Sequence, residues 1–276
     1  NTKDNWGRQL RLAERLDTLG SLSIHAIRPA LVQAFMDGLS DRPGKQGACF
    51  RVLKQLEKWA IVRDLLPHPI TTGVEIEESD GGHVPWTREQ VELGERHARK
   101  GFSRIITLAA NTGQRGSDLV KMRWTDIEEV NGRPGINVIQ KKTGRQIWVP
   151  FTQSLIAIMA GWERRPGFIL LRPSGIPWTR HRVSNDWVKE RRNNETLSPL
   201  KEAGLVIHGL RATACVRLSR AGATTRQISD MIGMSEQMVA RYCRFSDQKE
   251  NAVAAVMHLD GTPYERGTSA GWKTKR

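Results

Sequence analysis

Three side chains near the carboxyl end of the sequence could act together on a phosphate. His208 and Arg211 are three residues apart, so on a helix they share one face and both could point at one anion. Tyr242 follows them and is one of only two tyrosines in the chain. A tyrosine hydroxyl becomes a useful nucleophile when cationic neighbours and a base stabilise its anion. The pattern therefore indicates nucleophilic chemistry on a phosphodiester.

Helices are predicted around these residues. Thr224 and Gln227 have the spacing of a capping box at the start of one helix. Ser235 is a typical cap for the next helix, on which Met238 and Tyr242 are four apart and share a face. The helix after His208 should bury the apolar positions that recur at helical spacing, which are Leu210, Ala214 and Leu218.

A second candidate group lies upstream, where Arg115 and Asp118 follow Thr112 and Gly113. If both residues lie on one helix, their spacing of three lets the Asp118 carboxylate hold the Arg115 guanidinium in one orientation. The guanidinium fork then stays free for phosphate oxygens. The alternative interpretation is an ordinary surface ion pair, which contributes little to stability.

Residues 137–150 are predicted to form a β-hairpin, because apolar residues alternate on both sides of a Thr143-Gly144 turn. Lys142 comes directly before that turn, where a lysine can reach into a DNA groove and deliver a proton. A lysine on a β-turn is, however, most often only solvated. Lys141 is the alternative candidate, and strand alternation predicts that the two lysines point to opposite sides.

These segments, in this order, resemble the characteristic boxes of the tyrosine recombinase, or phage integrase, family. The resemblance rests on the H-x-x-R and tyrosine pattern, on the run LAANTGQRGSDLVKMRWTDI at 108–127, and on the lysine-bearing hairpin. It covers residues 86–256 well and the first eighty only in general character. It implies a mainly α fold with a small antiparallel β-sheet, in which an amino-terminal helical bundle precedes a tyrosine-recombinase-like catalytic domain.

The resemblance also implies an activity, that of a site-specific DNA recombinase or integrase. Such an enzyme cleaves and rejoins DNA through a 3′-phosphotyrosine intermediate, here for integration or excision of a mobile element such as a phage or genomic island. It needs no metal and no other cofactor. The implied roles are nucleophile for Tyr242, stabilisation of the phosphate and transition state for Arg115 and Arg211, general acid for Lys142, acid/base for His208, and support for Asp118.

One position departs from the family pattern. Where family members show L-G-H before the tyrosine, this chain reads Ile232-Gly233-Met234, so the second histidine is missing. Its loss could slow cleavage or mark a protein that has lost activity, and Met234 itself is interpreted as a core residue. Two alternative functions follow: a catalytically blunted DNA-binding protein derived from a recombinase, and a type IB topoisomerase-like enzyme.

Composition favours a polyanionic partner. The chain has 43 Lys and Arg against 29 Asp and Glu, a net charge of +14 and a pI near 10.3, which favours double-stranded DNA. An apolar run long enough to span a membrane is lacking, so no membrane association is expected. Cys49, Cys215 and Cys243 show no C-x-x-C spacing, which argues against a disulfide framework and a zinc site. A cytoplasmic, nucleoid-associated protein of a prokaryote or phage is expected.

The remaining histidines show no metal-ligand spacing, and each is interpreted as solvated or satisfied by its surroundings. They are His25, His68, His83, His97, His181 and His258.

The amino-terminal part is predicted to be a small helical bundle, and its acidic, glycine-containing end marks a linker. The expected domains are a core-binding DNA clamp at 1–74, a linker at 75–84, a catalytic domain at 85–260 and a flexible basic tail at 261–276. Basic side chains in both domains are expected to contact DNA phosphates, with a solvated surface as the alternative for each. They are Lys45, Arg51, Lys54, Lys58, Lys141, Arg180 and Arg182. The resemblance implies a homotetramer on DNA, in which the helix at 247–259 docks on a neighbouring protomer, and accessory DNA-bending proteins as further partners.

Overall fold

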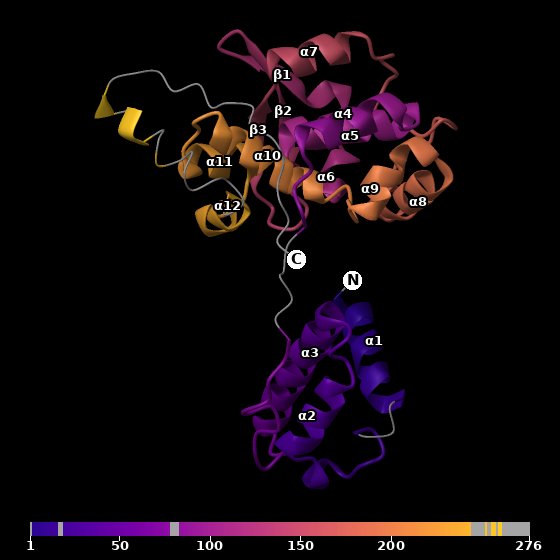
Figure 1. The fold of residues 1–276 in the computed structure, drawn as a ribbon, viewed down its shortest axis with the longest axis vertical. Coiled ribbons are helices and arrows are strands. Elements are labelled where there is room, and N and C mark those ends of the chain that lie inside the picture. Colours follow the sequence, from indigo (N-terminus) through magenta and orange to yellow (C-terminus); the bar gives the residue numbers. More distant parts are fainter. Residues whose placement is uncertain are drawn as a thin grey trace. The chain divides into compact units, whose positions relative to one another are not determined.

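The computed structural model describes residues 2–15, 19–77 and 83–243, together with 252, 255–257 and 259–260. The chain divides into two compact units, Asn1–Gly82 and His83–Arg276 (Figure 1). The expected tail at 261–276, and most of the helix expected at 247–259, lie outside the described residues.

The first unit is helical, as the sequence predicts. Its elements are α1 (Thr2–Arg15), the 3-10 helix η1 (Ile24–Ala26), α2 (Pro29–Asp37) and α3 (Pro43–Ile61). Proline begins α2 and α3, where its missing N–H costs nothing and its fixed φ suits a helix. Val32, Phe35 and Met36 of α2 pack with Leu53 of α3 in one apolar cluster.

The acidic stretch after α3 stays attached to this first unit as far as residue 77. The carboxylate of Glu57 on α3 accepts hydrogen bonds from the backbone amides of Ile70 and Thr71, both at 2.6 Å. Further along, the side-chain oxygen of Gln46 accepts from the amide of Glu77 at 2.8 Å. Ile70, Val74 and Ile76 of the same segment also pack against the apolar cluster of this unit.

The second unit contains helices and a small sheet. Its elements are α4 (Arg88–His97), α5 (Lys100–Thr112), α6 (Gly116–Leu119), η2 (Trp124–Asp126), β1 (Ile127–Val130), β2 (Arg133–Ile139), β3 (Gln146–Pro150), α7 (Gln153–Ala160), α8 (Arg180–Asn193), η3 (Glu195–Leu197), α9 (Ser198–Glu202), α10 (Gly209–Arg220), α11 (Thr225–Ile232) and α12 (Glu236–Cys243). The three strands pair antiparallel in the order β1-β2-β3. The mainly α fold with a small antiparallel sheet is therefore confirmed.

Buried α5 lies at the centre of the second unit and packs against α4 and α10 (Figure 1). Leu210 and Ala214 of α10 are buried as predicted, whereas Leu218 is only partly buried. The capping box predicted at Thr224 and Gln227 is present at the start of α11. Helix α10 therefore lies between the central helix and the pair α11 and α12.

The predicted hairpin is formed by β2 and β3, with Ile136 opposite Val149 and Val138 opposite Ile147, all four buried. However, β2 ends at Ile139, and the next residues form a turn. Strand alternation therefore does not reach Lys141 and Lys142 and cannot determine to which side each lysine points. Both lysines are exposed in the turn.

Candidate active site

Two helix ends supply the backbone groups that hold Arg211. Gly113 directly follows α5 and Gly233 directly follows α11, both in the left-handed conformation with φ of 64° and 69°, which glycine adopts at little cost. The Arg211 guanidinium donates to the carbonyls of Gly113, of Ile232 at 3.3 Å and of Gly233 at 3.4 Å. Only 3% of Arg211 is exposed. The carbonyls therefore fix the orientation of a buried cation.

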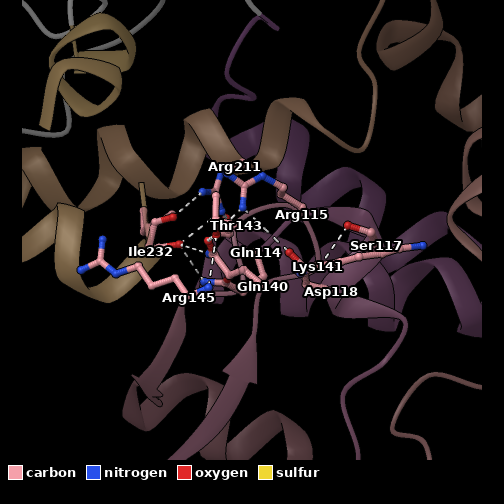
Figure 2. A network of polar contacts seen from close by, with 12 residues as sticks. Gln114, Arg115, Ser117, Asp118, Gln140, Lys141, Thr143, Arg145, Arg211 and Ile232 are labelled. Atoms are coloured by element: carbon pink, nitrogen blue, oxygen red, sulfur yellow. Dashed lines mark hydrogen bonds and ion pairs between the residues drawn. The ribbon is translucent and has the colours of Figure 1, made fainter. Parts of the chain in front are cut away.

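A buried glutamine joins the second arginine to the same network. Nη1 of Arg115 donates to Oε1 of Gln140 at 2.9 Å. Nε2 of Gln140 donates in turn to Oε1 of Gln114 at 3.0 Å and to the Ile232 carbonyl at 2.9 Å. Figure 2 shows Gln114 and Gln140 connecting Arg115 and Ile232, which also contacts Arg211. Both arginines are thus positioned by one set of hydrogen bonds.

Asp118 connects Arg115 to the lysine-bearing turn. Its buried Oδ1 accepts from the backbone amide of Lys141 at 3.0 Å and from the Ser117 hydroxyl at 3.1 Å (Figure 2). Its Oδ2 lies 4.0 Å from Nη1 of Arg115. Because the Asp118 side chain is 0% exposed, the pair is not the ordinary surface ion pair of the alternative interpretation. The carboxylate instead fixes the distance between α6, which follows Arg115, and the lysine-bearing turn.

His208 precedes the first residue of α10 and lies among positive charges. The pKa of its imidazole falls from 6.5 to about 4, first because of burial and then because of the nearby His83, Arg211, Arg180 and Arg115. The side chain is consequently neutral near neutral pH and able to accept a proton. The sequence suggested Arg180 only as a DNA contact, whereas the structure brings it close to His208.

The two arginines of the site act on each other. The pKa of Arg211 falls to about 10, first because of burial and then because of the charge of Arg115, while Cys215, Tyr242 and Asp118 act in the opposite direction. Arg211 therefore stays protonated at neutral pH, and its charge and that of Arg115 repel each other. An anion bound between them would relieve that repulsion.

Tyr242 lies on α12 and packs into a small apolar cluster, with 9% of the residue exposed. Met234 belongs to the same cluster, is 7% exposed, and lies with its Sδ 3.8 Å from Sγ of Cys215. Met234 is thus a core residue, as predicted. Ser235 caps α12 as predicted, since its Oγ accepts from the amide of Met238 at 3.4 Å.

The basic residues expected to contact DNA are mostly at the surface. Arg51, Lys54 and Lys58 are exposed on α3, Lys141 is exposed in the turn, and Arg180 and Arg182 are exposed in the first turn of α8, whereas Lys45 is partly buried. Among the described residues, no group of His, Cys, Asp and Glu could hold a metal ion. Within the same residues, no helix has the length and apolar character needed to cross a membrane.

Solved structures of the same fold are DNA-bound integrases. A lambda integrase dimer bound to a COC′ core site is 20% identical, with a TM-score of 0.67, covering 89% of this chain and 90% of that chain. The Tn1549 transposon integrase in complex with transposon right end DNA is 17% identical, with a TM-score of 0.71 and 94% of each chain covered. A lambda integrase tetramer bound to a Holliday junction is 19% identical, with a TM-score of 0.68, covering 89% and 73%. No curated protein matched the sequence.

The fold is that of the tyrosine recombinases, a class of enzymes that cleave and rejoin DNA. The model of the phage integrase family matches residues 96–249, which is more than half of the chain. The chain therefore belongs to the phage integrase family.

Proposed function

We propose that this protein is a site-specific recombinase that cleaves and rejoins DNA through a 3′-phosphotyrosine intermediate, in the integration or excision of a mobile element. The observation that carries the proposal is the pair Arg115 and Arg211, held close together in one buried network despite their mutual repulsion. Guanidiniums fixed in advance match the charge that develops on the non-bridging oxygens of an attacked phosphodiester. The electrostatic repulsion between the two guanidiniums is unfavourable in the free protein, and a bound phosphate would offset it.

The reaction balances with the residues present. The hydroxyl oxygen of Tyr242 forms a bond to phosphorus while the bond from phosphorus to the 5′ oxygen breaks. His208, neutral because its pKa is about 4, accepts the proton of the tyrosine hydroxyl. Lys142 donates a proton to the leaving 5′ oxygen, and Lys141 is the alternative donor. The 5′ hydroxyl of another strand then attacks the phosphotyrosine in the reverse reaction, so no external energy source is required.

Asp118 would support this chemistry by positioning the lysine-bearing turn. Its carboxylate holds the Lys141 amide at 3.0 Å, so the turn that presents Lys142 is tied to the helix that follows Arg115. The separation between the general acid and a phosphate-binding arginine is thereby limited. Such positioning matters because small misplacements of catalytic groups reduce rates steeply.

The proposed partner is double-stranded DNA. The residues at 1–74 would act as a clamp joined by the linker at 75–84 to a catalytic domain at 85–260, with a basic tail at 261–276. The net charge of +14 supports DNA as the partner, and so do the DNA-bound structures of the same fold. A homotetramer on DNA is proposed from the lambda integrase tetramer on a Holliday junction. Accessory DNA-bending proteins are proposed as further partners.

A covalent trapping experiment tests the proposal. Duplexes selected from a random library for tight binding would be rebuilt with a nick beside each candidate cleavage position, so that the cleaved fragment diffuses away. We expect a protein–DNA adduct that survives denaturation with the natural chain and is absent with Tyr242→Phe. Tight, sequence-dependent binding without any adduct would refute the proposal and favour a non-catalytic DNA-binding protein.

A further inference from the structure

The second unit begins with a segment that lies across the start of α10. The amide of Trp86 donates to Oγ1 of Thr213 at 2.7 Å, and its indole Nε1 donates to the Val206 carbonyl at 3.0 Å. A side chain on Gly209 would bring its Cβ within 2.5 Å of the Val84 carbonyl oxygen. The absence of a side chain at Gly209 therefore lets the segment lie directly against the helix that follows His208.

This anchoring places a second histidine beside the first. The rings of His83 and His208 have centroids 4.9 Å apart and meet edge to face at an interplanar angle of 85°. His208 is partly buried, whereas His83 is exposed. His83 is solvated, as the sequence suggested, but its ring also contacts His208 and is the more exposed of the two.

The other charged groups around His208 cannot take up its proton. Arg211 on α10, Arg180 on α8 and Arg115 before α6 are the remaining groups that act on its pKa, and each is a cation at neutral pH. A protonated His208 would be repelled by all three. Partial burial lowers the pKa of His83 as well, so this imidazole is neutral near pH 7 and has a free nitrogen lone pair.

We propose that His83 relays protons between His208 and solvent. During cleavage, the proton released by the Tyr242 hydroxyl passes to a nitrogen of His208, then to His83, and from His83 to water. During rejoining, the proton follows the opposite path and returns to the phenolate oxygen. The transfer requires the exposed His83 ring to turn from its edge-to-face packing so that one nitrogen faces His208, and no other reactant is needed. The relay rests on the proposed function, in which His208 is the proton acceptor.

The test measures the rate of adduct formation on the nicked duplex under saturating protein. His83→Phe keeps an aromatic ring against His208 but removes both nitrogens, and His83→Ala removes the ring. General acid–base groups contribute about 10²–10⁴-fold, so we expect a loss of about tenfold or more in both variants. The dissociation constant for the intact duplex and the thermal midpoint should not change. The matched control is His97→Phe, at an exposed histidine on α4.

Chemical rescue separates proton transfer from packing. Free imidazole added to His83→Ala should restore much of the rate, whereas His83→Phe, in which the space is filled, should not respond. A Phe variant as fast as the natural chain, or an Ala variant that imidazole does not rescue, would overturn the relay while the adduct of the natural chain still supports the recombinase. No adduct with the natural chain would instead refute the proposed function and the relay with it.

Discussion

Replacing Gln140 by methionine tests whether the buried network holds the site together. The side chain is buried, and its volume is nearly kept in Gln140→Met, so the loss is mainly of hydrogen bonds. Oε1 of Gln114 loses the donor at 3.0 Å, while the Ile232 carbonyl keeps its bond from Gln114 at 3.2 Å. The Arg115 side chain is 21% exposed and can turn to water. The unpaired buried acceptor on Gln114 and the weakened donor on Arg115 together lower the free energy of unfolding by about 2–4 kcal/mol.

The assay is denaturant unfolding of the full chain followed by tryptophan fluorescence, with adduct formation measured in parallel. We expect the free energy of unfolding of the second unit to fall by about 2–4 kcal/mol. Adduct formation should also slow, because Arg115 loses its fixed orientation. Gln146→Met is the matched control, since Gln146 is exposed on the same hairpin and such surface changes stay within about 0.5 kcal/mol. Equal effects of the two substitutions would refute the view that Gln140 organises the site.

Three further predictions concern the same groups. Gly233→Ala should lower the thermal midpoint and adduct formation, because its φ is 69° and its Cβ would lie 2.5 Å from Nε2 of Gln140; an unchanged midpoint would contradict the geometry. Arg180→Ala should raise the pKa of His208, measured by NMR, whereas Arg182→Ala should not, because only Arg180 is among the charges that lower it. Stability should fall as the pH drops from about 6.5 to about 4, since the unfolded state binds the His208 proton and the folded state does not; His208→Gln should flatten that part of the profile of thermal midpoint against pH.

The sequence was informative where local rules decide the structure. The capping box at Thr224 and Gln227 and the hairpin of residues 137–150 depend on residues close in the chain, and the structure confirms them. Periodicity alone did not determine burial: Leu31 and Leu56 fit the helical pattern, yet are 37% and 42% exposed. An amphipathic pattern identifies a helix, but the width of its buried stripe depends on what packs against it.

The missed site residues depend on distant contacts. Gln140 has the same strand parity as the buried Ile136 and Val138, so alternation could have marked it as an inward-facing amide. Its partners Gln114 and Ile232, however, are 26 and 92 residues away. His83 carries no motif at all and becomes notable only through its contact with His208. Tertiary folding, rather than spacing, brings these groups together.

The carbonyl partners of Arg211 suit the phosphate binding that the proposed function assigns to it. A carboxylate partner would orient the guanidinium but also neutralise its charge, and a phosphate would then have to compete with it. The carbonyls of Gly113, Ile232 and Gly233 orient Arg211 without cancelling that charge. Burial and then the charge of Arg115 lower the pKa of Arg211 to about 10, which still leaves Arg211 protonated at neutral pH. The buried carboxylate of Asp118 lies instead 4.0 Å from Arg115 and accepts a hydrogen bond from the Lys141 amide, so it aligns the turn and leaves the positive charge free for the phosphate that the proposed function requires.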